Sequence, residues 1–111
     1  MLAKKDRLPV KSYFRQKAER EITRRFFVYK WFPKEKESPR VGVVVGKKIH
    51  KIAAKRNELR RSVYSHIQTI QKSLIPTHDV LIIALRPIGF PSDKHGMIDE
   101  LTKILCSKHS S

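Results

Sequence analysis

The chain has 111 residues and a mass of 13.0 kDa, and 25 Lys and Arg against 10 Asp and Glu give a net charge of +15 at pH 7. This length predicts one domain, residues 1–111, with a single core, and the longest apolar run, residues 80–85, is too short to span a membrane. The only cysteine, Cys106, excludes an intramolecular disulfide and is typical of a reducing compartment. Because the basic start of the chain also lacks the apolar segment of a secretory signal, we expect a cytoplasmic protein.

The positive charge is concentrated in the first part of the chain. Residues 1–61 hold 20 Lys and Arg and 6 Asp and Glu, a net charge of +14, whereas residues 62–111 hold 5 and 4, a net charge of +1. Such an asymmetry predicts a surface that binds a polyanion, and nucleic acid is the first candidate. A membrane surface is less favoured, because it would need a basic amphipathic helix with large apolar residues opposite.

The first predicted elements are a helix and two strands. Residues 12–20 can form a short helix with Ser12 as its N-cap, and residues 24–32 are aromatic and β-rich, with apolar side chains on both faces of the expected strand. A charged turn, residues 33–39, separates them from a second expected strand at residues 40–48. These two strands are expected to form a hairpin.

The second half of the chain predicts two helices around a buried strand. A helix is expected from about Ala53 to Gln71, because one stripe at 100° per residue collects Ile52, Leu59, Val63, Ile67, Ile70 and Leu74. Residues 78–87 form a nearly continuous apolar run, which predicts a strand buried on both faces, and residues 97–106 predict a last helix. The order is α-β-β-α-β-α, and the expected fold is an α+β two-layer sandwich.

The start of the long predicted helix carries an unusual cluster of cations. From Lys47 to Arg61 there are seven Lys or Arg and one acid, Glu58. Cations in a first helical turn oppose the macrodipole by about 0.3–1 kcal/mol each, whereas an anion bound there would reverse the sign of this effect. Arg56 also falls inside the apolar stripe. A solvated charge run is the alternative interpretation, and we favour an anion site.

Three other chemistries are not favoured by the sequence. Gly42 and Gly46 are separated by three residues rather than the four of a phosphate-binding loop, and no Ser or Thr follows Lys47. The five histidines show no metal-ligand spacing, so no metal site is expected. The ten carboxylates are scattered, whereas a protein nuclease usually clusters them. We therefore predict no catalytic residues.

Aromatic residues are interleaved with cations in residues 11–31. Single-stranded nucleic acid needs this combination, because bases stack on rings while phosphates meet cations. Phe14, Phe26, Tyr29 and Trp31 are the candidates. A core position is the alternative for each of them, and it is the commoner role of an aromatic residue in a small domain.

The segment "GKKIHKIAAKRNELRRSV" resembles the bacterial ribonuclease P protein subunit. A strand that ends in Lys-Lys, a short loop, and Arg-Asn-x-hydrophobic-basic-Arg at the start of a long helix carry the resemblance. It extends over nearly the whole chain, because "DRLPVKSYFR" resembles the first helix of that family, "FFVYKW" and "RVGVVVGKK" its hairpin, and "HDVLIIALRP" its third strand.

The resemblance implies a left-handed crossover, against the usual right-handed rule, and a function. The family's protein assists a catalytic RNA that removes the 5′ leader from precursor tRNA, and the RNA subunit with its Mg²⁺ ions performs the cleavage. The implied partners are the ribonuclease P RNA subunit and precursor tRNA. The sequence identifies no protein partner, no membrane association and no motif for a cofactor bound by the protein itself.

The resemblance also assigns residues to two sites. The implied RNA-binding element is Lys47, Lys48, Lys51, Lys55, Arg56, Asn57, Arg60 and Arg61. The implied cleft for the single-stranded leader contains Phe14, Phe26 and Tyr29, with Arg60 at its border. Glu58 stands where the family usually has a third basic residue, so we leave it out of the RNA-binding set.

Two other functions remain alternatives. A structural RNA-binding protein, such as a ribosomal protein, fits the charge and size equally well, but it would not prefer precursor tRNA to mature tRNA. A self-sufficient nuclease is less favoured, because it would have to cleave RNA without an RNA subunit.

Overall fold

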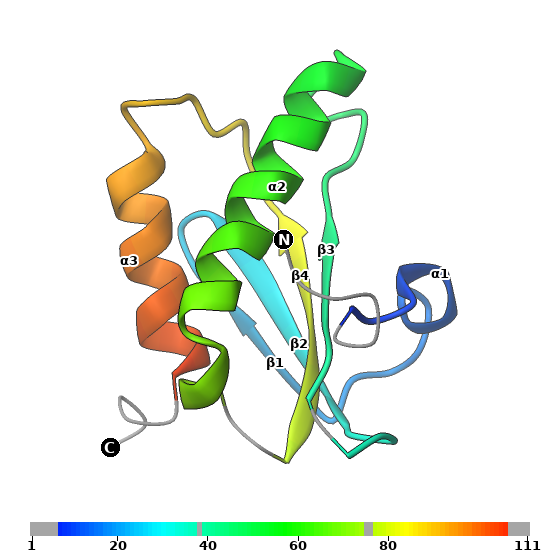
Figure 1. The fold of residues 1–111 in the computed structure, drawn as a ribbon. Coiled ribbons are helices and arrows are strands. Elements are labelled where there is room, and N and C mark those ends of the chain that lie inside the picture. Colours follow the sequence, from blue (N-terminus) through cyan, green and yellow to red (C-terminus); the bar gives the residue numbers. More distant parts are fainter. Residues whose placement is uncertain (1–6, 38, 75–76, 107–111) are drawn as a thin grey trace.

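The computed structural model describes residues 7–37, 39–74 and 77–106. It contains three α-helices, a 3-10 turn and four strands (Figure 1). In chain order these are α1 (Val10–Tyr13), β1 (Arg20–Thr23), β2 (Phe27–Pro33), β3 (Val41–Val44), α2 (Ala53–Thr69), η2 (Gln71–Ser73), β4 (His78–Ala84) and α3 (Lys94–Leu105). The expected α+β class is confirmed, and the expected order α-β-β-α-β-α broadly fits, with β1 as an additional strand. None of the helices among these residues is long and apolar enough to cross a bilayer.

The four strands form one sheet in the order β1-β2-β4-β3. Strand β2 pairs antiparallel with both β1 and β4, whereas β3 pairs parallel with β4, with Val41 opposite Val80. The predicted hairpin between residues 24–32 and 40–48 is therefore wrong, because β4 lies between these two strands. Strand β4 is apolar on both faces, and a central place in the sheet buries both of them.

The N-terminal elements also differ from the prediction. The expected helix at 12–20 is replaced by the four residues of α1, and Pro9 rather than Ser12 occupies the N-cap. The chain already pairs with β2 at Glu19, whose N–H donates to the Trp31 carbonyl, and β1 begins at the next residue. Short isolated helices are marginal in water, so pairing with β2 wins over helix formation in this segment.

Helices α2 and α3 lie side by side on one face of the sheet (Figure 1). The chain leaves β3, runs back along α2 in front of the sheet, and returns in β4 to the left of β3, with both strands pointing up in this view. A parallel connection that moves in this direction with its helix in front is left-handed. The structure thus has the crossover hand that the family resemblance implied.

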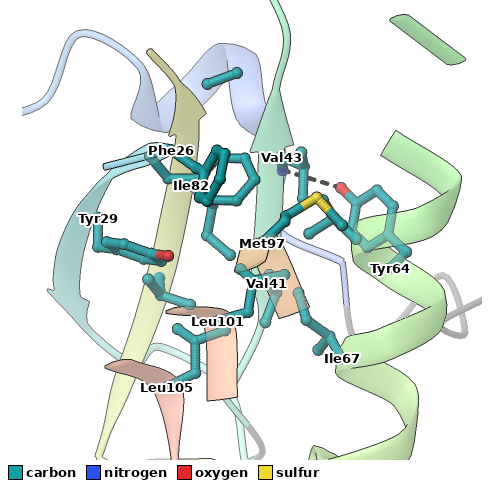
Figure 2. Packing of buried hydrophobic residues seen from close by; sticks show 14 of the residues in the cluster. Phe26, Tyr29, Val41, Val43, Tyr64, Ile67, Ile82, Met97, Leu101 and Leu105 are labelled. Atoms are coloured by element: carbon teal, nitrogen blue, oxygen red, sulfur yellow. Dashed lines mark hydrogen bonds between the residues drawn. The ribbon is translucent and has the colours of Figure 1, made fainter. Parts of the chain in front are cut away.

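Strand alternation divides the apolar side chains between two clusters. The larger cluster lies between the sheet and the two helices, where Tyr29, Ile82 and Val43 of the sheet meet Ile67 of α2 and Leu101 of α3 (Figure 2). The smaller cluster is on the opposite face, where Leu8 and Tyr13 from the segment around α1 pack with Phe32 of β2 and Leu81 of β4.

A buried ion pair closes the end of the sheet where β3 and β4 begin. Asp79 is fully buried, and one of its oxygens lies 3.3 Å from Nη2 of Arg40 while the other accepts the Arg40 backbone N–H at 2.7 Å. The same guanidinium nitrogen donates to the Tyr13 hydroxyl at 3.0 Å. This network joins α1, β3 and β4 at one point, because Arg40 directly precedes β3.

Candidate nucleic-acid interface

The predicted basic element lies at the opposite end of the sheet, where β3 ends and α2 begins. A tight turn forms this loop, because the N–H groups of Ile49 and His50 both donate to the Gly46 carbonyl, at 3.0 and 3.2 Å. The turn leaves four lysine side chains exposed along the loop and the first turn of α2: Lys47, Lys48, Lys51 and Lys55. The structure thus brings the predicted lysines together on one end of the molecule.

The first turn of α2 has neither a side-chain cap nor an acidic residue. Its N-cap is Ile52, which has no side-chain oxygen to accept the free N–H groups of the helix start. Lys55 and Arg56 add positive charge to the positive end of the helix dipole. A bound anion would satisfy the free N–H groups and relieve this electrostatic strain.

The hydrogen bonds of Arg56 explain how a cation is accommodated inside the apolar stripe of the helix. Its Nη1 donates to two carbonyls of the preceding loop, those of His50 at 2.9 Å and Lys51 at 3.0 Å. The guanidinium therefore turns back along the helix and holds the loop that carries the lysines. Arg56 is half-buried and combines a structural role with its positive charge.

The remaining members of the element continue along α2. The Asn57 amide oxygen accepts a hydrogen bond from the Arg60 guanidinium, and Arg61 is exposed one residue later. Across residues 7–37, 39–74 and 77–106, no cation from Lys47 to Arg61 forms an ion pair with a carboxylate. The positive charge at this end of the sheet is consequently uncompensated within the described structure.

The structure does not bring together the three aromatic residues expected to line the leader cleft. Tyr29 and Phe26 are 0% and 4% exposed and belong to the cluster beneath the helices (Figure 2). The Glu100 carboxylate of α3 accepts the Tyr29 hydroxyl at 2.7 Å and the Phe26 N–H at 3.0 Å. Burial is the main cause that raises the pKa of Tyr29 well above its usual range, and the hydrogen bond to Glu100 is the second cause.

We therefore correct the geometry of the expected cleft. Phe26 and Tyr29 are core residues, since neither ring has a free face on which a base could stack. Phe14, directly after α1, is 46% exposed and lies on the chain between the exposed cations Lys11, Arg15 and Lys17. Of the three, only Phe14 has the exposure that stacking requires, and binding of a leader stays a prediction.

His50 is a structural residue that the sequence did not single out. Its Nε2 accepts the backbone N–H of Ile88 at 3.2 Å, which joins the loop before α2 to the loop after β4. No local sequence signal could have shown this contact, because the two residues are far apart in the chain. His66 of α2 contacts Thr102 of α3 through Nε2 at 2.8 Å, and burial lowers the pKa of this histidine.

The carboxylates stay dispersed in the fold, as they are in the sequence. Within the part of the chain that the structure describes, no group of three or more His, Cys, Asp or Glu residues is placed to hold a metal ion. Asp79 and Glu100 are engaged in the structural contacts above. The side chains present at the basic end are suited to holding phosphates.

Known proteins share both the sequence pattern and the fold. The family model described as Ribonuclease P matches residues 2–108. The "Ribonuclease P protein component" of Synechococcus sp. is 36% identical over 69 residues, which cover 61% of this chain and 52% of that protein, so the match spans about half of the curated relative.

Solved structures support the same relationship at the level of the fold. The RNase P protein from Thermotoga maritima, in complex with 1-(4-fluorophenyl)-2-thiourea, superposes with a TM-score of 0.71 at 20% identity, covering 89% of this chain and 96% of that one. The Staphylococcus aureus RNase P protein gives a TM-score of 0.60 at 23% identity, covering 78% and 83%. These structures share the fold of the chain, and the family match over residues 2–108 shows that the chain belongs to the ribonuclease P family.

Proposed function

We propose that this chain is the protein subunit of a ribonucleoprotein endoribonuclease that removes the 5′ leader of precursor tRNA. The catalytic partner in this proposal is a ribonuclease P RNA subunit, and its Mg²⁺ ions carry out the cleavage. Family membership supports this role. The protein contributes binding energy and positioning.

The uncompensated charge of the basic end carries the proposal. Lysines in the loop before α2, the cations of its first turns and the uncapped helix start face outward without acid partners among the described residues. In the free protein these cations repel one another, whereas a phosphate backbone would neutralise them and release its counterions. We assign the RNA subunit to this end of the molecule.

The leader is proposed to run on the side of the sheet that bears α1. Phe14 offers an exposed ring there, and Lys11, Arg15 and Lys17 offer charge. A single strand can stack one base on such a ring while its phosphates meet the neighbouring cations. Replacing Phe14 by Ala should weaken binding of leader-bearing precursor tRNA more than binding of leaderless tRNA. Equal losses for both RNAs would contradict this placement.

The deciding experiment is cleavage of precursor tRNA by a bacterial ribonuclease P RNA at low Mg²⁺, with and without the protein. We expect stimulation only when both components are present. Cleavage by the protein alone would show a self-sufficient nuclease. Tight RNA binding without stimulation, and without preference for precursor over mature tRNA, would show a structural RNA-binding protein.

Salt dependence tests the electrostatic basis of the proposal. If six to eight phosphates are contacted, the logarithm of affinity against the logarithm of salt should have a slope of about −4 to −7. Changing Lys47, Lys48 and Lys51 to Gln should flatten that slope by about 2 to 3. The matched control changes Lys36, Lys72 and Lys103, which are exposed elsewhere, and it should leave the slope unchanged. Equal effects of both triple variants would show that only the total charge matters.

A further inference from the structure

A cavity of about 370 Å³ lies beside the basic element and is not explained by phosphate binding. It opens between the loop before α2, the first turns of that helix, and the loop that follows β4. Its volume is within the range of about 300–1,000 Å³ that is usual for small-ligand sites.

Hydrogen bonds hold the cavity open from three sides. The His50 ring accepts the Ile88 N–H and so fixes one loop to the other. The Asp93 carboxylate accepts the Gly89 N–H at 2.9 Å, which shapes the loop after β4. Arg56 fixes the loop before α2 through its two carbonyl contacts. The cavity is therefore preformed, and binding does not need to order its walls.

The lining of the cavity combines an apolar wall with separated charges. Five apolar residues form the wall: Ile49, Ile52, Leu59, Ile88 and Phe90. Ile52 is 62% exposed, an unusual exposure for an isoleucine, and it forms the solvent-facing part of this wall. Lys51 and Lys55 stand at the cavity and form no ion pair among the described residues.

Glu58 is the one acid among these cations, and it also lines the cavity. Among residues 7–37, 39–74 and 77–106, no hydrogen bond or ion pair engages its carboxylate, although Lys55 and Arg61 are one helical turn away on either side. An acceptor at the edge of an apolar cavity can bind a ligand that has an apolar face and an N–H donor at its rim.

We propose that this cavity binds one unstacked nucleobase of the RNA subunit. The base lies against the apolar wall that includes Phe90, its flanking phosphates meet Lys51 and Lys55, and an exocyclic amino or ring N–H group donates to Glu58. Carboxylates accept from base amino groups in this way, and unstacked bases are the parts of an RNA that proteins read most readily. The RNA subunit is the source because the cavity adjoins the element assigned to it, so this inference rests on the proposed function.

Filling or altering the cavity tests the proposal. Gly89 lines the cavity, and a Cβ added there meets no atom closer than 3.8 Å, so Gly89→Leu should fold and add bulk at the edge of the cavity. Ile52→Ala removes an exposed part of the wall without adding an N-cap oxygen to α2. Each variant should weaken binding of the RNA subunit about 5- to 100-fold, the range of base–aromatic stacking. Gln68→Leu and Leu85→Ala are matched controls at exposed positions outside the cavity, and they should bind as the wild type does. Wild-type affinity in both cavity variants would overturn the proposal.

Replacing Glu58 gives a test that depends on the sign of the effect. Removing a negative charge from a basic surface should tighten RNA binding if Glu58 acts only through electrostatics. If Glu58 accepts a hydrogen bond from a bound base, Glu58→Gln should instead weaken binding. The remaining acceptor oxygen is then neutral, and the other carboxylate oxygen is replaced by an NH2 donor. Tighter binding by this variant would overturn the role given to Glu58.

Chemical probing of base edges, with dimethyl sulfate for adenine and cytosine and a carbodiimide for guanine and uracil, separates the sources of the base. An unpaired base of the RNA subunit should be protected by the wild-type protein and should react again with Gly89→Leu. Protection on precursor tRNA alone, or on neither RNA, would overturn the inference. If the wild-type protein stimulates cleavage while the cavity variants match it in binding, the inference fails and the proposed function stands. Loss of stimulation by the wild type would contradict the proposed function itself.

Discussion

The two ends of the sheet differ in whether their positively charged side chains have carboxylate partners. Where β3 and β4 begin, Arg40 is buried against the fully buried Asp79 and the Tyr13 hydroxyl. Where β3 ends and α2 begins, the cations are exposed or half-buried, and those from Lys47 to Arg61 have no carboxylate partner in the described residues. Charge that the fold neutralises serves the fold, whereas charge left without a partner indicates an external anion.

The difference also separates stability from binding. A buried ion pair is costly to break, because one charge remains in a poorly solvated place. Exposed cations contribute little to folding and oppose it when they crowd one another. Substitutions at the first end should therefore change the free energy of unfolding, and substitutions at the second should mainly change RNA affinity and its salt dependence.

The largest expected effect is at the buried pair. Asp79→Ala leaves the Arg40 guanidinium without its carboxylate, and it should lower the free energy of unfolding by about 3–5 kcal/mol, measured by urea denaturation. Lys103→Ala is the control, because it breaks an exposed pair with Asp99 and should cost about 0.5 kcal/mol or less. Equal losses in the two variants would remove the distinction between the ends.

Arg56 should be the exception within the basic end. Arg56→Ala removes two hydrogen bonds to loop carbonyls and should lower the free energy of unfolding by about 1–2 kcal/mol as well as weaken RNA binding. Arg61→Ala, at an exposed neighbour on the same helix, should weaken RNA binding alone. Urea denaturation and RNA titration of both variants measure the two effects separately.

Arg56→Lys separates the charge of this residue from its contacts. The substitution keeps the charge but replaces the planar guanidinium with a single ammonium. Stability between that of the wild type and Arg56→Ala, together with nearly unchanged salt dependence, is expected. A stability equal to wild type would show that the carbonyl contacts contribute nothing.

A neutral contact at the open edge of β3 should give a smaller effect. The Tyr64 hydroxyl of α2 accepts the Val43 N–H at 3.1 Å (Figure 2). Tyr64→Phe leaves this buried donor without its acceptor and should cost about 1 kcal/mol, measured by urea denaturation. Faster hydrogen exchange at the Val43 amide should accompany the loss, while RNA affinity stays at the wild-type value. Unchanged exchange would show that the hydroxyl does not protect this edge.

Tyr64 also shows where sequence reasoning reached its limit. Helical periodicity predicted the buried positions Leu59, Val63 and Ile67 correctly, but its apolar stripe does not include Tyr64, which is buried as well. The tyrosine is buried because it packs from α2 against the edge of β3, where its hydroxyl accepts the Val43 N–H. Periodicity describes one contact stripe, and it contains no information about a second contact at a sheet edge.

The strand pairing was predicted wrongly for a related reason. The sequence showed that residues 78–84 are apolar on both faces, yet the two earlier strands were paired because they are neighbours in the chain. A strand that must be buried on both faces takes the centre of the sheet, and this separates β2 from β3. Strand β1 was missed because, as an edge strand, it has only one apolar residue, Ile22.

The candidate site was predictable in its charge and not in its aromatic part. A cluster of cations at a helix start is visible in the sequence, because its electrostatic cost is local. The burial of Phe26 and Tyr29 depends on Glu100, more than 70 residues later, which no local pattern reveals. The cavity at Glu58 likewise depends on the loop after β4.

The smallest expected effect concerns a histidine between the two ends. His66 lies at a groove between α2 and α3 whose other charged residues are Arg61 and Lys94, and burial lowers its pKa. The unfolded chain therefore binds this proton more readily than the folded one, so its contribution to stability is present above the ordinary pKa of about 6.5 and is lost as pH falls below it. The free energy of unfolding, measured by urea denaturation from about pH 8 to about pH 5, should depend less on pH in His66→Gln than in the wild type.

His95→Gln, at an exposed position of α3, is the control and should follow the wild type. Protonated His66 would add a positive charge to the groove that Arg61 and Lys94 also line. If His66→Gln has the same pH profile as the wild type, burial of this histidine does not affect stability, and unfavourable positive charge is limited to the start of α2.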